Sequence, residues 1–254
     1  MPMPPLPRPA KRIRALWWAA LGATVVVTAG CAVWRVGQSK ALARQSEPFE
    51  QRPDAATRRL LIAGDSTAVG TGASSPAHSL AGLIAQQHPK LLIENRARDG
   101  ALFADVAEQL LRPGRFDVVL VQAGGNDVIR LRSAASMRKD IDSVLEAARQ
   151  RADVVILMPA GNVGNAPFFF APWSWWMTSR AREMHRLIAA ATAPSNAVYV
   201  NLFKERDDDP FVRQPELNAS DGLHPSDAGY RVWSQVLQDQ ADFSGRLQGK
   251  TQPP

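Results

Sequence analysis

Residues 118–127 read VVLVQAGGND. The first five of these residues are almost wholly apolar and do not alternate with polar ones, which is typical of a strand buried on both faces of a parallel sheet. Glycine and polar residues follow directly, so the strand is predicted to end in a turn. Apolar runs at 91–94 and 154–158 share this pattern. The stretch therefore predicts the interior of a parallel β-sheet.

Outward from this stretch, short apolar runs alternate with longer amphipathic segments. Ile141, Val144, Leu145 and Ala148 have the i, i+3, i+4, i+7 spacing of one buried helix face. A β-α-β-α succession implies an α/β fold, with a parallel sheet covered by helices on both sides. The predicted strands are 60–63, 91–94, 118–122, 154–158 and 198–202, and the predicted helices are 76–88, 102–112, 133–151, 173–192 and 226–240.

Charge and cysteine content exclude several classes of protein. The 254 residues carry a formal charge of +6, but eight of the 30 Lys and Arg residues and only three of the 24 acidic residues precede residue 57. The remainder is nearly neutral, so we expect no nucleic-acid partner. Cys31 is the only cysteine, which excludes an intramolecular disulfide and a cysteine-based zinc site. Since the four histidines lack the spacing of common metal motifs, we predict no metal and no cofactor.

The N-terminal part predicts a membrane anchor. Residues 15–34, ALWWAALGATVVVTAGCAVW, contain no charge, and twenty residues cover about 30 Å as a helix, the thickness of a bilayer core. Basic residues precede this run, and tryptophans lie near both of its ends. We therefore predict a basic cytoplasmic leader at 1–14 and a transmembrane signal anchor at 15–36.

Two alternatives to the anchor stay open. Residues 28–31, TAGC, resemble a lipobox, which would make Cys31 a lipoprotein anchor. A buried helix of a soluble protein is the other alternative. The remaining divisions are a linker at 37–56, one folded domain at 57–245 and a flexible tail at 246–254. The anchor predicts a single-pass protein of a bacterial inner membrane, with its domain on the periplasmic side.

Small and polar residues follow the predicted strands, at the sheet edge where α/β proteins bind ligands. Ser66 follows the first strand in Gly64-Asp65-Ser66-Thr67, Gly100 follows the second, and Asn126 follows the third. Asp221 and His224 precede the last helix, three residues apart. Each feature alone is also typical of an ordinary turn or helix cap, but all four occur in order.

Together these residues resemble the four sequence blocks of the SGNH (GDSL) hydrolase family, which supply Ser, Gly, Asn and His. The resemblance covers roughly residues 58–240. It implies a flavodoxin-like three-layer α/β/α sandwich with a five-stranded parallel sheet. Ser66 would be the nucleophile, His224 the general base and Asp221 its orienting partner, with Ser66, Gly100 and Asn126 forming the oxyanion hole. Thr67 stands where the family's first block has leucine, which leaves the subgroup open.

The resemblance predicts a membrane-anchored serine esterase that acts through an acyl-enzyme on a small-molecule or lipid ester. One alternative is an O-acetyl esterase or acyltransferase acting on cell-envelope carbohydrate. An alternative of another class is a non-catalytic binding domain that retains the fold. The sequence assigns no oligomeric state.

An aromatic segment, PFFFAPWSWW at 167–176, follows the fourth predicted strand. Phe169, Trp173, Trp175 and Trp176 are candidates for substrate binding, as an acyl-binding wall or a membrane-facing lip. The alternative is a helix entrance packed into the core. His185, which lies between Arg182 and Arg186, is predicted on a solvated helix face.

Overall fold

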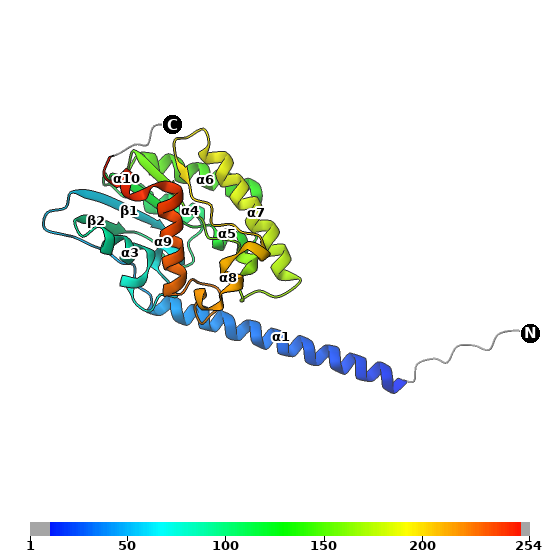
Figure 1. The fold of residues 1–254 in the computed structure, drawn as a ribbon. Coiled ribbons are helices and arrows are strands. Elements are labelled where there is room, and N and C mark those ends of the chain that lie inside the picture. Colours follow the sequence, from blue (N-terminus) through cyan, green and yellow to red (C-terminus); the bar gives the residue numbers. More distant parts are fainter. Residues whose placement is uncertain (1–10, 250–254) are drawn as a thin grey trace, which may run out of the picture.

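The computed structural model describes residues 11–249 and contains one five-stranded parallel sheet. The strands lie in the order β2-β1-β3-β4-β5, so the chain starts next to the centre and moves outward in both directions (Figure 1). The strand bounds are β1 Arg58–Gly64, β2 Leu91–Asn95, β3 Val118–Gln122, β4 Val154–Leu157 and β5 Val198–Tyr199. The predicted α/β fold and parallel sheet are confirmed, and β5 is shorter than the predicted 198–202.

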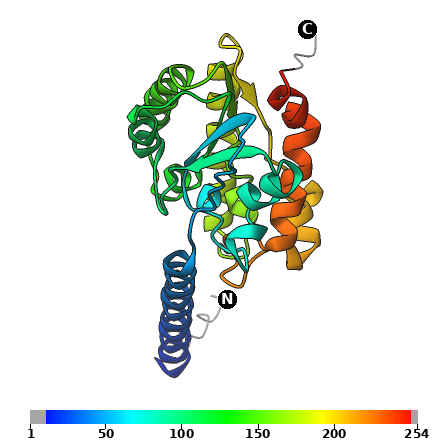
Figure 2. The same cartoon turned by 90° about the vertical axis from the view of Figure 1, so that its left-hand side faces the viewer.

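Two hydrophobic cores lie on the two faces of the sheet. Leu61 and Ala63 of β1 belong to one core, whereas Leu60 and Ile62 belong to the other, because successive side chains of a strand point to opposite faces. The first core includes α4 (Phe103–Leu111), α6 (Ala134–Arg149) and α7 (Trp173–Thr192); the second includes α3 (Leu80–Gln87), α9 (Asp227–Ala241) and α10 (Phe243–Leu247). The result is a three-layer α/β/α sandwich (Figure 2).

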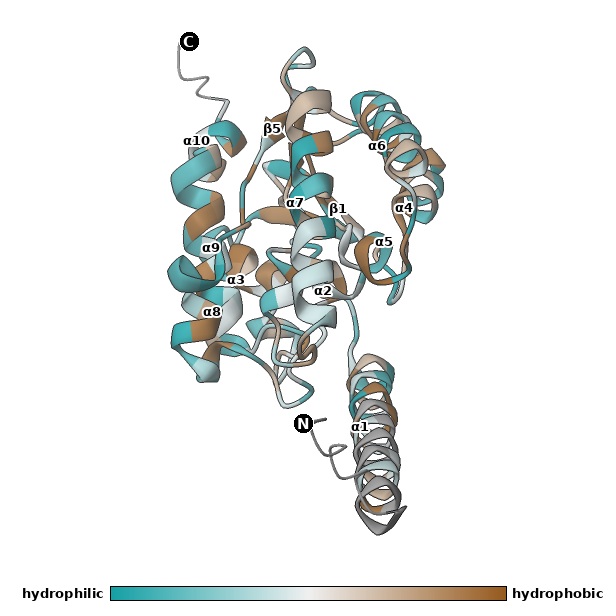
Figure 3. Ribbon diagram, turned by 90° about the vertical axis from the view of Figure 1, so that its right-hand side faces the viewer, coloured by the Kyte–Doolittle hydropathy of each residue, from teal (hydrophilic) through white to brown (hydrophobic). Residues whose placement is uncertain are grey.

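The helices form where the sequence pattern predicts them. Ile141, Val144, Leu145 and Ala148 of α6 are buried, and Ser133 caps that helix by accepting the Ser136 N–H at 3.1 Å. Apolar and polar residues recur along α6 and α9 (Figure 3), as expected for helices with one face on the sheet. Helices of one or two turns were not predicted: α2 (Ser66–Val69), α5 (Gly125–Ile129), α8 (Pro210–Arg213) and α10.

The N-terminal helix α1 (Lys11–Gln45) runs past the foot of the domain and extends well beyond it (Figure 1). It includes the predicted anchor and the first nine residues of the predicted linker. The extension has a local cause, since residues 40–45, KALARQ, are strong helix formers. Across residues 11–249, no helix combines the length and the apolar character of a membrane span, so the predicted transmembrane helix is not confirmed.

The chain returns to the domain directly after α1. The Gln51 N–H donates to the carbonyl of Ile93 at 3.1 Å, and the Ile93 N–H donates back at 2.8 Å, which joins this segment to the outer edge of β2. The second half of the predicted linker is therefore tied to the sheet. At the other end, α10 reaches Leu247, inside the predicted tail. Most of the predicted leader, residues 1–10, and tail residues 250–254 lie outside the described residues.

Candidate active site

The carboxyl end of β1 places Ser66 at the start of the one-turn helix α2. Asp65 caps this helix, with Oδ1 accepting the Thr67 N–H at 2.9 Å and the Thr67 hydroxyl at 2.7 Å. Gly64 allows the sharp exit from the strand, since a Cβ there would lie 2.0 Å from the Gln122 carbonyl oxygen. Ser66 is 9% exposed, so its hydroxyl lies at the domain surface but in a largely enclosed position.

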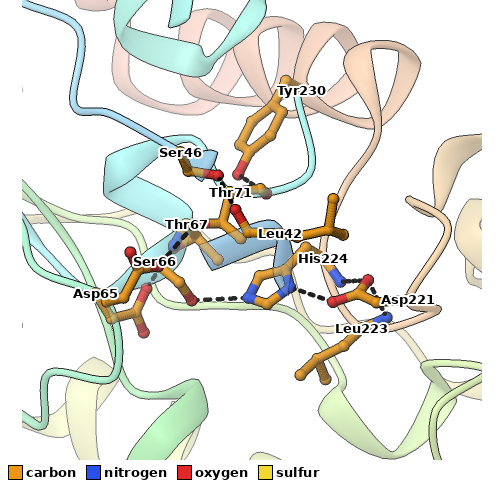
Figure 4. Close-up of polar contacts among 11 residues, drawn as sticks. Leu42, Ser46, Asp65, Ser66, Thr67, Thr71, Asp221, Leu223, His224 and Tyr230 are labelled. Carbon is orange, nitrogen blue, oxygen red and sulfur yellow. Dashed lines mark hydrogen bonds and ion pairs between the residues drawn. The ribbon is translucent and has the colours of Figure 1, made fainter. Parts of the chain in front are cut away.

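Ser66, His224 and Asp221 form a continuous hydrogen-bonded row (Figure 4). The Ser66 Oγ lies 2.9 Å from Nε2 of His224, and Nδ1 of the same ring lies 2.6 Å from Oδ2 of Asp221. The side chains of His224 and Asp221 are both buried. The structure therefore brings together the three residues that the sequence singled out, although Ser66 and His224 are 158 positions apart.

The loop before α9 holds the carboxylate of Asp221 in an ionised state. Burial alone would raise the pKa of Asp221, but the bond to the His224 ring, its charge, and the N–H groups of Leu223 and His224 outweigh burial and lower the pKa to about 2. Those N–H groups donate to Oδ1 at 3.0 and 3.1 Å. Because a carboxylate can only accept, it fixes the imidazole proton on Nδ1 and leaves Nε2 to accept from Ser66.

Gly100 and Asn126 line the same cavity as Ser66 and His224. Gly100 has a φ of +74°, a conformation that L side chains rarely adopt, and its carbonyl accepts from Nη2 of Arg130 at 2.9 Å. Asn126 donates one amide hydrogen to the Ala101 carbonyl at 3.2 Å, which leaves the other available. Within residues 11–249, the N–H groups of Ser66 and Gly100 have no acceptor. These donors can face a ligand.

The cavity has a volume of about 490 Å³, inside the range of about 300–1,000 Å³ typical of small-molecule sites. Its walls include the loops after β1, β2, β3 and β4, the segment before α9, and parts of α1 and α9. Apolar side chains supply much of the lining, among them Ile129, Val163, Phe168, Leu223 and Trp233. A nucleophilic hydroxyl thus opens into a largely apolar pocket.

Three further acidic residues lie around this strand edge. Burial raises the pKa of Asp65 to about 6 and that of Asp127 to about 7. Burial also raises the pKa of Asp99, which accepts the Thr71 hydroxyl at 2.7 Å. Asp127 accepts the Phe103 N–H at 3.1 Å through Oδ2, while its buried Oδ1 has no partner in the described part of the chain. Sequence reasoning assigned no role to these carboxyl groups.

The four aromatic candidates lie outside the cavity, and Phe168 lines it instead. Phe169 packs against the core on the α7 face of the sheet. Trp173, Trp175 and Trp176 are 52%, 71% and 43% exposed, which fits neither an acyl-binding wall nor a core-packed helix entrance, and the membrane-facing lip stays a prediction. Trp173 and Trp176 lie on one side of α7 with ring centroids 5.2 Å apart, and none of the three indoles lines the space around Ser66.

His185 corrects another prediction, because it is buried rather than solvated. Its Nδ1 lies 2.6 Å from the Tyr199 hydroxyl and its Nε2 lies 2.8 Å from the Ala160 carbonyl. Burial lowers the pKa of His185 to about 4, so the ring is neutral at ordinary pH. Within residues 11–249, no group of His, Cys, Asp and Glu side chains is arranged to hold a metal ion.

Comparisons with known proteins agree with this geometry. The sequence profile of the GDSL-like lipase/acylhydrolase family matches residues 62–232. No curated protein matches the chain significantly.

Among solved structures, an α/β hydrolase from the metagenome of Lake Arreo, Spain, is 18% identical, with a TM-score of 0.59 over 74% of this chain and 96% of that one. A lipase/acylhydrolase from Enterococcus faecalis is 20% identical, with a TM-score of 0.55 over 78% and 100%. A variant acetyl xylan esterase from Geobacillus stearothermophilus is 19% identical, with a TM-score of 0.56 over 74% and 96%. At these identities the similarity shows the fold.

Proposed function

The chain belongs to the GDSL-like lipase/acylhydrolase family, and from that premise we propose that it hydrolyses carboxylic esters through an acyl-enzyme formed on Ser66. The observation that carries the proposal is the row of Ser66, His224 and Asp221, with contacts of 2.9 and 2.6 Å. A serine hydroxyl is a weak nucleophile at neutral pH, so it needs a base within hydrogen-bond reach.

In the first half-reaction, the Ser66 Oγ attacks the ester carbonyl carbon while its proton passes to Nε2 of His224. The imidazolium that forms is stabilised by the ionised Asp221 beside Nδ1. Collapse of the tetrahedral intermediate breaks the bond to the alcohol oxygen, and His224 returns the proton to that oxygen. Water then attacks the acyl-Ser66 by the same sequence and releases the carboxylic acid, so no cofactor enters the balance.

The negative charge on the former carbonyl oxygen is assigned to three donors: the N–H groups of Ser66 and Gly100 and the side-chain amide of Asn126. The cavity that these residues share supports the assignment. Donors fixed before the reaction stabilise charge that appears only in the transition state, and losing one typically costs about 2.7–4 kcal/mol.

Labelling with a fluorophosphonate probe tests the nucleophile. We expect the wild-type chain to be labelled and to hydrolyse aryl esters, and Ser66→Ala to do neither. Ser179→Ala, which alters an exposed serine on α7, is the matched control and keeps both properties. Equal labelling of wild type and Ser66→Ala would refute the proposal, and an unlabelled, inactive wild type would favour a non-catalytic binding domain. Comparing acetylated sugars with aryl and longer-chain esters separates the O-acetyl esterase from the general esterase.

We also propose that the N-terminal segment anchors the enzyme to a bacterial inner membrane, with the catalytic domain on the periplasmic side. The uncharged run at 15–34 and the basic residues before it support this proposal. Exposed aromatic side chains at the start of α7 suit the headgroup region of a bilayer. Alkaline extraction of membranes tests it, since an anchored chain stays in the pellet. Cys31→Ser distinguishes a transmembrane anchor from a lipid anchor on Cys31, because only a chain held by the lipid would be released by that change.

A further inference from the structure

One face of α1 lines the active-site cavity. Val36, Ser39, Lys40 and Ala43 border the same space as Ser66 and His224. Their positions have the i, i+3, i+4, i+7 spacing of a single helix stripe, so α1 presents two successive turns to the cavity. Figure 4 shows Leu42 of this helix, and Ser46 just after it, in the same close-up as Ser66 and His224. All four lining residues of α1 precede the segment that the family profile matches.

Hydrogen bonds hold this helix to the aromatic segment at 167–168, which is itself bonded to the loop that carries Asp221 and His224. The Arg35 guanidinium donates to the carbonyls of Pro167 and Phe168, the latter at 2.8 Å. Phe168 lines the cavity, and its N–H donates to the Gly222 carbonyl at 2.9 Å, between Asp221 and His224. Bonds from a charged donor are about twice as strong as neutral ones. Arg35 therefore connects α1 to Phe168, and Phe168 connects to the loop that carries Asp221 and His224.

The wall that α1 contributes is partly apolar. The side chains of Val36 and Ala43 add to the apolar lining that Phe168 and Leu223 provide, and Ser39 and Lys40 lie beside them. A cavity of about 490 Å³ has room for far more than the acetyl group of an acetyl ester. Each further methylene that is buried against apolar surface strengthens binding, so a longer chain is expected to bind more tightly.

We propose that residues 36–43 of α1 bind the apolar chain of the substrate, so that the enzyme selects esters with a medium or long acyl or alkyl chain over their short-chain homologues. This inference rests on the esterase activity proposed above and deepens it. The helix that leads toward the proposed anchor is thereby part of the substrate site, and chain selectivity depends on residues outside the segment that the family profile matches.

Substitutions on two faces of α1 test the proposal. In the full chain, reconstituted in lipid nanodiscs, Val36→Trp combined with Ala43→Trp fills the cavity side of the helix. Ala41→Trp, which makes the same change as Ala43→Trp at an exposed position that does not line the cavity, is the control. The readout is the ratio of kcat/KM for a long-chain ester to that for its short-chain homologue. It is measured with p-nitrophenyl acetate and decanoate and with methyl and decyl acetate. We expect the ratio to fall at least tenfold in one of the two series for the double variant and to stay at the wild-type value for Ala41→Trp.

A second pair of variants tests the attachment without adding bulk. Arg35→Ala removes the bonds to residues 167 and 168, whereas Arg44→Ala removes an exposed arginine of the same helix. We expect only Arg35→Ala to lower the ratio. The proposal would be overturned if Ser66-dependent hydrolysis persists and the ratios of the double variant and of Arg35→Ala match those of their controls in both series. Loss of all Ser66-dependent hydrolysis in the wild type would instead overturn the proposed function.

Discussion

Asp127 is a buried carboxyl group whose ionisation lowers the stability of the folded protein. Asp127→Asn removes this effect while keeping the shape of the side chain. The residue is fully buried, and its Oδ2 accepts the Phe103 N–H at the start of α4. Burial is the largest influence and raises its pKa to about 7; the Phe103 N–H and Arg132 lower the pKa, whereas Asp65 and Asp140 raise it further. Asparagine retains an oxygen that can accept from Phe103, but it does not ionise.

The magnitude follows from the difference between the folded and unfolded pKa values. The folded pKa of about 7 lies about three units above the ordinary aspartate pKa of 3.8, and each unit is 1.36 kcal/mol, so ionisation of Asp127 costs about 4 kcal/mol of folding stability. Because the folded pKa is raised, the penalty is absent below pH 3.8, grows as the pH rises, and is complete above pH 7. The free energy of unfolding of Asp127→Asn should therefore gain up to about 4 kcal/mol on that of the wild type between pH 4 and pH 8.

Urea unfolding at a series of pH values measures this difference. Asp239→Asn, which changes an exposed carboxylate on α9, is the matched control and should follow the wild-type pH profile. In Asp127→Asn the substituted side chain carries a buried amide, whose cost is the same at every pH and so shifts the curve without changing its slope. Parallel profiles for Asp127→Asn and the wild type would refute the reasoning, because they would mean that Asp127 does not change its ionisation on folding over this range.

Three other substitutions have defined outcomes. Asp221→Asn keeps the shape of the pair but removes the carboxylate that holds the His224 proton on Nδ1, so kcat should fall about 10⁴-fold in steady-state assays of an aryl ester. Asn126→Ala removes one donor to the oxyanion and should lower kcat about 10²- to 10³-fold with little change in fluorophosphonate labelling of the folded protein. Gly124→Ala places a Cβ at a φ of +112°, 2.4 Å from the Met184 sulfur, and should lower the free energy of unfolding by about 1–3 kcal/mol in urea titrations.

The centre of the sheet was predictable because β3 is buried on both faces. Residues 118–122 form β3 with the predicted bounds, and all five of its residues are buried. The end of β5 was not predictable in the same way. Val200 is fully buried and its N–H still donates to the Leu157 carbonyl, although the strand has already ended at Tyr199. Burial persists after strand pairing stops, so an apolar run overestimates the length of an edge strand.

The positions of Ser66, Gly100 and Asn126 were predictable because each follows a strand of the parallel sheet, whereas the roles of Asp221 and His224, which precede the last helix, came from the family resemblance. Parallel strands have all their carboxyl ends on one side, so residues that follow different strands meet without any contact being known in advance. His185 shows where this reasoning stops. Its burial depends on the Tyr199 hydroxyl and the Ala160 carbonyl, and neither partner can be identified from the two arginines beside it in the sequence.

The aromatic segment at 167–176 shows the same limit at a finer scale. The sequence predicted that this segment lies beside the site. Which of its rings lines the cavity depends on the backbone contacts of Phe168 with Arg35 and Gly222. The carbonyl of Phe168 is held by Arg35 and its N–H by Gly222, so both polar backbone groups of this residue are bound and its ring is fixed in the cavity wall. Trp175, with no such constraint on its ring, stays 71% exposed. Composition therefore identifies a candidate wall, whereas hydrogen bonds between segments more than 50 residues apart decide which side chain forms it.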